Sequence, residues 1–329
     1  MRMLKSRFVS ELYRQILRRN PNPGEISRFI LDTAVGNDLP VRIGSMINSR
    51  EFEIMILPEL VRKATEEYQG GNVFFLHVPK TAGTSVRLAL SDSMGVPSFN
   101  LYSRTVPKPP RLPTSMQFWP LWAGHANLHF YPETHSGLTI FRESRSRILS
   151  RFRQSQYEWL KLSPHLITPK SGAVPKKEPI NFNEWINRSD KGIAQWYLSN
   201  PASMYESPSW RKYVNDLSEL DLAHNLEKGL KRFAAAAWIH NPEDVLKSIG
   251  IVTGKELNSL PRENEFKETK LFKEVVINSS TLQILEEVRK RDAIVFKVAS
   301  ELGILVGELK ENEDALFDTT LKRLGFRLK

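Results

Sequence analysis

The feature that most constrains the fold is a short apolar run that ends in a proline- and glycine-containing loop and continues as a helix. Residues 73–78 read Val-Phe-Phe-Leu-His-Val, which predicts a buried parallel strand. Residues 79–83 break the run, and the helical pattern of residues 84–90 opens on two hydroxyl residues able to cap it. A second strand, expected at 138–141, likewise runs into a helix over about 145–160. Repeated strand–loop–helix units indicate an α/β fold with a parallel sheet.

The 329 residues are enough for one large domain and a small one. Residues 1–68 predict a small all-α domain, because apolar side chains recur there at helical spacing and a Pro- and Gly-rich turn separates two of the helices. Residues 72–305 form the main domain, in which 181–305 is expected to be mostly helical. Residues 306–329 predict a C-terminal helical tail.

The composition excludes several classes of protein. The chain has no cysteine, which rules out disulfides, thiolate metal sites and a cysteine nucleophile. It holds no run of about 18 apolar residues, so no integral membrane segment is predicted. The first twenty residues lack the continuous apolar core and cleavage site of a secretory signal. We therefore expect a cytoplasmic protein.

The positive charge is concentrated in one third of the chain. Residues 71–180 hold 14 basic and five acidic side chains, a net charge of +9, against +10 for the whole chain. A local basic excess favours an anionic ligand. Nucleic acid, a nucleotide and an acidic sugar all satisfy this condition, so the charge alone does not choose between them.

The loop after the first strand has the chemistry of an anion-binding site. It contains Pro79, Lys80, Thr81, Ala82, Gly83, Thr84 and Ser85. The small residues at 82 and 83 let the backbone approach a ligand closely, and the start of the helix presents N–H groups and a partial positive charge. Lys80 adds a full charge, and the hydroxyls add donors. The Walker A pattern, in which lysine follows glycine, does not occur in the chain.

A second basic motif follows the second strand. It runs from Arg142 to Phe152 and includes Arg147 and Ser150. The planar guanidinium group of arginine bonds two phosphate oxygens at once, which suits it to a phosphate site.

Histidines between the two motifs are candidates for a general base, because an imidazole titrates near neutral pH. His125, in the pair Gly124-His125, is the first candidate. The alternatives from the residues alone are His77, His129 and His135, and the carboxylates Glu133 and Glu143.

Together these residues resemble the carbohydrate sulfotransferases that use the nucleotide sulfate donor PAPS, in particular the heparan sulfate 2-O-sulfotransferase group. Residues 79–85 resemble that family's 5′-phosphosulfate loop, PKTxGTS, with Ala82 where many members have glycine. Residues 142–152 resemble its 3′-phosphate motif, R-[DE]-x-x-x-R-x-x-S-x-[FY], with Ser144 where proline is common. The resemblance spans about residues 72–305, and its specificity lies in these two motifs.

The resemblance implies a three-layer parallel sheet with a P-loop-like nucleotide site. PAPS would be the sulfate donor and PAP the product, without a metal. Arg142 and Ser150 would hold the 3′-phosphate, Arg147 would either contact the donor or orient the loop, and His125 would be the base. Lys80 would stabilise charge on the oxygen that bridges phosphorus and sulfur.

The acceptor is inferred from two further features. Residues 8–24 and 48–52 resemble a small helical domain of bacterial surface-associated and glycosyltransferase-linked proteins, which favours a bacterial surface glycan or its precursor as acceptor and a role for residues 1–68 in docking a protein partner. Five cations lie in proline-rich loops outside both motifs, and an acidic glycan or simple solvation explains them equally well; they are Lys108, Arg111, Lys170, Lys176 and Lys177.

Two other functions fit part of the sequence. A P-loop-like nucleotide kinase needs a Walker A lysine and a magnesium-binding acidic residue, and neither is evident. A non-catalytic polyanion-binding protein fits the charge, but no nucleic-acid module is recognisable, so nucleic acid is not expected as a partner. The oligomeric state is left open by the sequence.

Overall fold

The computed structural model describes most of the chain. The described residues are 2–34, 46, 49, 51–56, 59, 63, 68, 70–96, 98–102, 119–125, 128–166, 181–188, 192–198, 213–261, 274–309 and 312–329. The chain divides into two compact units, Met1–Gln69 with Pro107–Trp119, and Gly70–Val106 with Pro120–Lys329. We describe each unit by itself.

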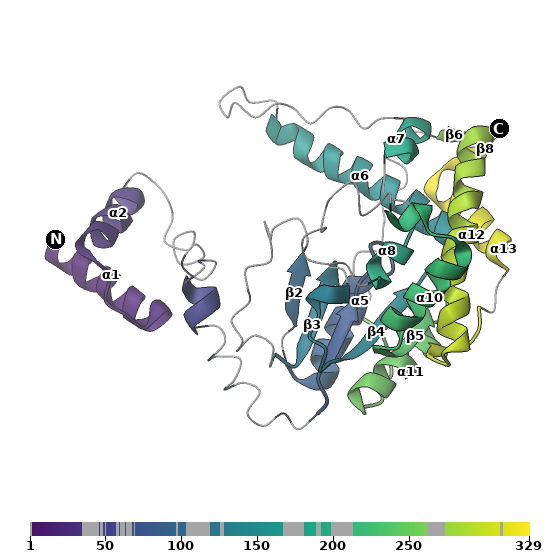
Figure 1. The fold of residues 1–329 in the computed structure, drawn as a ribbon. Helices are drawn as coiled ribbons and strands as arrows, with labels where there is room; N and C mark the ends of the chain where they lie inside the picture. Colours follow the sequence, from purple (N-terminus) through teal and green to yellow (C-terminus); the bar gives the residue numbers. More distant parts are fainter. Residues whose placement is uncertain are drawn as a thin grey trace. The chain divides into compact units, whose positions relative to one another are not determined.

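The first unit is helical where it is described. It contains α1 (Arg2–Leu17), α2 (Pro23–Ala34) and a π-helical turn, η1 (Phe52–Ile56), which confirms the first two predicted helices (Figure 1). The apolar stripe of α1 packs with residues of α2 and η1 into a small core of Val9, Leu17, Phe29 and Met46. The third predicted helix, from about residue 41, lies mostly outside the described residues.

Arg19 ties this unit together. Its guanidinium donates to both carboxylate oxygens of Glu25, over 2.9 and 2.7 Å, and to Glu51 Oε2 over 2.8 Å. It also lies 5.2 Å from the ring centre of Tyr13. Arg19 and Glu51 are among the residues that resemble the glycan-associated domain, so these matched residues have a structural role here.

The second unit is an α/β structure built on a parallel sheet. In chain order its elements are β1 (Val73–Leu76), α5 (Gly83–Met94), β2 (Phe99–Tyr102), β3 (Leu121–His125), η3 (Leu128–Phe130), β4 (Ser136–Phe141), α6 (Ser144–Leu166), α7 (Phe182–Arg188), α8 (Ala194–Tyr197), α10 (Glu219–Leu230), β5 (Phe233–Trp238), α11 (Pro242–Thr253), β6 (Val275–Ile277), α12 (Ser279–Glu301), β7 (Leu305–Val306), α13 (Glu313–Leu324) and β8 (Phe326–Leu328) (Figure 1).

Six described strands form the main sheet in the order β2-β3-β1-β4-β5-β7, and every neighbouring pair is parallel. The prediction of an α/β fold with a parallel sheet is confirmed. Strands β1 and β4 are the two that the sequence indicated. Residues 181–305 are less helical than expected, because they also contain β5 and β6.

Helices flank the sheet, because successive side chains of a strand point to opposite faces. On one face Phe75 stacks on His77, which contacts the start of α5, and α5 is joined to α11 by a hydrogen bond from Ser93 Oγ to Thr253 Oγ1. On the other face, Phe141 packs against Tyr197 of α8 and Phe296 of α12.

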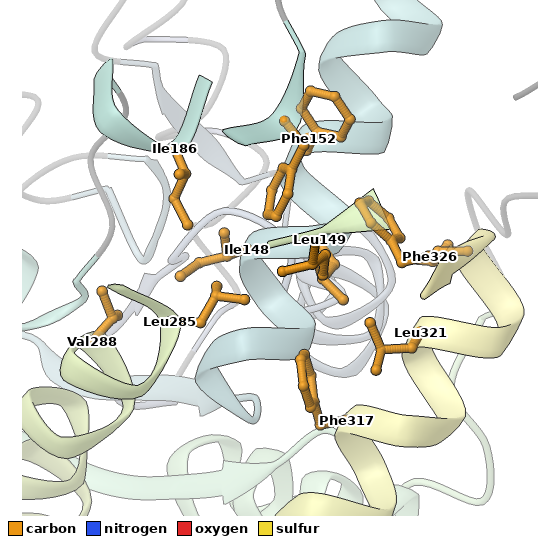
Figure 2. Close-up of a cluster of buried hydrophobic side chains, with 12 residues drawn as sticks. Ile148, Leu149, Phe152, Ile186, Leu285, Val288, Phe317, Leu321 and Phe326 are labelled. Atoms are coloured by element: carbon orange, nitrogen blue, oxygen red, sulfur yellow. The ribbon is translucent and has the colours of Figure 1, made fainter. Parts of the chain in front are cut away.

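A second apolar core joins α6 to the last part of the chain. Ile148, Leu149 and Phe152 of α6 pack against Phe317 and Leu321 of α13 and Phe326 of β8 (Figure 2). Strand β8 pairs in parallel with β6 in a small separate sheet. The C-terminal helical segment therefore packs into the same unit as the sheet. None of the described helices has the length and apolar content needed to cross a lipid bilayer.

Candidate functional site

Three neighbouring strands end at the candidate site. Strand β1 lies between β3 and β4, and all three are parallel. Their carboxyl ends lead into residues 79–85, His125 and Arg142. In open parallel sheets, ligands bind outside the carboxyl ends of the strands, where neighbouring connections diverge to opposite sides. The sheet therefore brings together three features that are up to 63 residues apart in the sequence.

The loop after β1 has the backbone of an anion-binding loop. Lys80 and Ala82 both adopt left-handed conformations, with φ of 73° and 57°. Alternation of right- and left-handed residues turns successive N–H groups toward one concave side, where an anion binds. Ala82 is also the N-cap of α5, and no described side chain caps that helix. A small residue is favoured at 82, since bulky residues rarely tolerate this φ.

The hydroxyl groups of the loop differ in their surroundings. Thr81 Oγ1 is buried and donates to the carbonyl oxygen of Val78 over 2.8 Å, so its proton is used inside the loop. Thr84 is half-buried and Ser85 is buried on the first turn of α5. The expected hydroxyl cap is not present, because α5 begins one residue earlier than expected, at Gly83, and Ala82 takes the cap position.

The ring of His77 occupies the space that a side chain at position 83 would fill. A Cβ built at Gly83 would lie 1.9 Å from His77 Nε2. The ring of His77 is also stacked on Phe75, with 5.6 Å between centroids. A small hollow beside this contact is lined by Phe75, His77, Gly83, Thr84, Arg87, Ala123 and Gly124.

We expect Gly83→Ala to abolish anion binding by the loop. The added methyl group must displace either the His77 ring or the start of α5, and overpacking of this kind costs about 1–3 kcal/mol of stability. Thermal denaturation with and without an anionic ligand measures both effects. Gly95→Ala, at the C-cap of α5, is a control for glycine replacement without overpacking: a Cβ there meets no atom within 4 Å, and only the left-handed φ of 70° adds strain. Ligand binding by Gly83→Ala at the level of the unmodified protein would contradict the prediction.

His125 is oriented by the backbone. Its Nδ1 lies 2.7 Å from the carbonyl oxygen of His77. A carbonyl oxygen can only accept a hydrogen bond, so Nδ1 carries the proton, and in the neutral ring Nε2 is the unprotonated nitrogen. That tautomer is the one a general base requires. The rings of His125 and His77 lie 4.0 Å apart between centroids.

His77 is held in the neutral form. Burial lowers its pKa well below the usual value, and the neighbouring basic side chains of His125, Lys80 and Arg87 lower it further. At neutral pH His77 therefore adds no charge to the site. Its ring packs between Phe75 and Gly83, as expected of a packed histidine.

Arg142 joins the two predicted motifs directly. Its Nη1 donates to the carbonyl oxygen of Lys80 over 3.1 Å, and Lys80 Nζ donates to Gln154 of α6 over 3.4 Å. Ser150 is buried one turn before Gln154, on the same side of α6. Burial, with the charges of Arg323 and Arg147, lowers the pKa of Arg142 to about 10, so Arg142 is charged at neutral pH.

Glu143 closes the start of α6. Its carboxylate accepts from the backbone N–H groups of Arg145 and Ser146, over 3.1 and 2.7 Å, and from Arg145 Nε over 2.8 Å. The carboxylate is fully buried, so it is badly placed to accept a proton from an acceptor hydroxyl. The N-terminus of α6 is thereby occupied, whereas no side chain in the described ranges caps the N-terminus of α5. An anion has better access to α5.

Arg147 connects α6 to α12 through a buried ion pair. It is buried, and its Nη2 lies 3.8 Å from Asp292 Oδ2 of α12. The position of Arg147 favours the alternative that it orients the loop, because its charge is directed at α12.

The other proposed bases lie elsewhere. Glu133 and His135 precede β4, at the amino edge of the sheet, and His135 is buried. The side chain of His129 lies outside the described residues, as do the five loop cations at 108, 111, 170, 176 and 177. Of the candidates whose side chains are described, His125 and His77 are the histidines at the carboxyl edge.

Sequence reasoning missed Gln154 and His240. Gln154 contacts Lys80, and its spacing of four residues from Ser150 is a signal that a helical-face analysis would detect. His240 follows β5, a strand that was not predicted, so the sequence carried no signal for it. Among the described residues, no group of three His, Asp or Glu side chains is arranged to hold a metal ion.

No protein-family model matches the sequence, and no curated protein matches it. The functional assignment therefore rests on the residues and geometry described above.

Proposed function

We propose that this protein is a PAPS-dependent sulfotransferase that transfers a sulfuryl group to a hydroxyl of a carbohydrate. The observation that carries the proposal is the meeting of three sequence features at adjacent strand ends, with Arg142 hydrogen-bonded to the backbone of Lys80. An uncapped helix start, a lysine, a buried arginine and an oriented histidine together match the needs of an anionic nucleotide donor and a hydroxyl acceptor.

The loop of residues 79–85 would bind the 5′-phosphosulfate end of the donor, and Arg142 with Ser150 would bind its 3′-phosphate. The acceptor oxygen attacks sulfur, while the bond from sulfur to the bridging oxygen breaks. His125 Nε2 takes the proton of the acceptor hydroxyl. Lys80 stabilises the negative charge that remains on the bridging oxygen of the product, PAP, and this interaction strengthens as the bond breaks.

The acceptor is proposed to be a bacterial surface glycan or its precursor. The support is the resemblance of the two motifs to carbohydrate sulfotransferases and the resemblance of residues 8–24 and 48–52 to a glycan-associated domain. A screen of glycan acceptors with radiolabelled PAPS identifies the acceptor directly.

Donor binding provides the first test. PAP is expected to raise the melting temperature, because a ligand that binds only the folded state stabilises it, by about 2.7 kcal/mol at a hundred times its Kd. ADP lacks the 3′-phosphate that Arg142 and Ser150 would hold, so it should raise the melting temperature far less. Differential scanning fluorimetry with equal concentrations of the two nucleotides measures the difference. Equal shifts, or a larger shift with magnesium ATP, would rule out the proposed donor site.

A further inference from the structure

A fourth strand end contributes to the same edge of the sheet. Strand β5 pairs in parallel with β4, with Trp238 opposite Phe141. The backbone N–H of Ile239 continues this pairing by donating to the carbonyl oxygen of Phe141 over 2.9 Å. His240 therefore leaves β5 next to the position where Arg142 leaves β4. It lies in the turn before α11 and belongs to neither predicted motif.

Each of these two side chains holds a buried nitrogen that is unpaired within the described part of the chain. Arg142 Nε and His240 Nε2 are each buried, and neither has a hydrogen-bond partner among the described residues. A buried polar atom left unpaired is destabilising, so native structures rarely retain one without a use for it. An anion bound between the two side chains would satisfy both.

The surroundings of His240 favour a neutral imidazole that can donate a hydrogen bond. Burial is the main cause that lowers the pKa of His240 to about 4, and the charges of Arg142 and Arg323 lower it further, while Glu143 opposes them. The ring is therefore neutral at pH 7 and can present one N–H group. Arg323 is exposed near the end of α13, and the end of that helix is held to α6 by Arg153, which donates to the carbonyl oxygens of Leu324 and Gly325.

We propose that His240 donates a hydrogen bond from Nε2 to the phosphate group that Arg142 binds, with Arg323 adding positive charge beside it. This inference rests on the proposed donor site and adds to it a residue that follows β5 and a residue of α13. With Ser150 of α6, the phosphate would then be recognised by four separate parts of the chain: the ends of β4 and β5, α6 and the end of α13.

Calorimetric titration with PAP and ADP tests the inference. His240→Leu removes the donor and is expected to weaken PAP binding about tenfold or more, since hydrogen bonds to charged groups are worth about 1.5–3 kcal/mol. ADP binding should change less than threefold. His240→Gln retains an N–H donor and should restore PAP affinity to within about threefold. His224→Leu, at an exposed position of α10, is the matched control and should bind PAP normally.

A second measurement separates contact from packing. A bound phosphate offsets the charges of Arg142 and Arg323, so PAP should raise the pKa of His240, followed by NMR of the imidazole. In the free protein, Arg323→Gln should also raise it, whereas Lys322→Gln, the neighbouring exposed cation on α13, should raise it less. Unchanged PAP affinity in His240→Leu, or no response of the His240 ring to PAP, would overturn the inference alone. Failure of the unmodified protein to prefer PAP over ADP would overturn the donor site as well.

Discussion

Replacing His125 by alanine is expected to reduce sulfuryl transfer by roughly 10²–10⁴, the range typical of a positioned general base. PAP affinity should stay within about twofold of its original value, because His125 contacts the backbone of His77 and belongs to neither nucleotide motif. The experiment compares kcat with radiolabelled PAPS, using an acceptor from the screen, and the Kd for PAP from calorimetry.

His224→Ala is the control, since His224 is exposed on α10 and belongs to none of the segments that follow β1, β3, β4 and β5. Full activity in His125→Ala would show that another group accepts the proton. His77 would then be the next residue to replace, because its ring lies against that of His125 at the same edge. Loss of PAP binding together with activity would instead give His125 a structural role.

Replacing Asp292 by alanine is expected to lower the free energy of unfolding by about 3–5 kcal/mol, the usual cost of removing one partner of a buried ion pair. Asp292 is fully buried in α12 and accepts hydrogen bonds from Ser144 Oγ over 2.7 Å and from the backbone N–H of Ile193 over 2.9 Å. It also faces the buried guanidinium of Arg147. Alanine leaves all three groups without this acceptor in the interior.

Urea denaturation of both variants checks this prediction. Asp314→Ala is the matched control: Asp314 pairs with Arg145, but its side chain is 76% exposed, so its loss should change stability by less than about 1 kcal/mol. A destabilisation of Asp292→Ala no larger than that of the control would contradict the assigned role. Because Ser144 begins α6 two residues after Arg142, a folded Asp292→Ala protein should also bind PAP more weakly.

Local sequence was sufficient for several elements. The apolar run at 73–78 and the β-forming residues before Arg142 predicted β1 and β4, since a continuous apolar run is typical of a strand that is buried on both faces, as in a parallel sheet. The small residues at 82 and 83 predicted a loop that approaches a ligand, and the left-handed φ of Ala82 agrees with that backbone. These features depend on a few consecutive residues, so they can be read without knowledge of the fold.

Strand β5 shows where local sequence was insufficient. Its residues, Phe233-Ala-Ala-Ala-Ala-Trp, contain a helix-favouring alanine run. The run is a strand because it pairs with β4 on one side and β7 on the other, and tertiary burial outweighs a propensity of less than about 1 kcal/mol per residue. With β5 unpredicted, His240 could not be placed beside Arg142.

The motifs and their candidate chemistry were thus determined by the sequence, whereas the strand order decided that the motifs lie side by side at one edge of the sheet. Parallel pairing of β3, β1, β4 and β5 aligns their carboxyl ends. The residues that follow these strands, which include His77 and His240, therefore lie at one edge of the sheet. The same packing separated the candidate bases. Glu133 lies at the opposite edge, because it precedes β4 and the two ends of a strand lie at opposite edges of the sheet. Glu143 caps α6, because a buried carboxylate must accept hydrogen bonds from nearby N–H groups. Such long-range pairing has no local signature, and only the tertiary structure shows it.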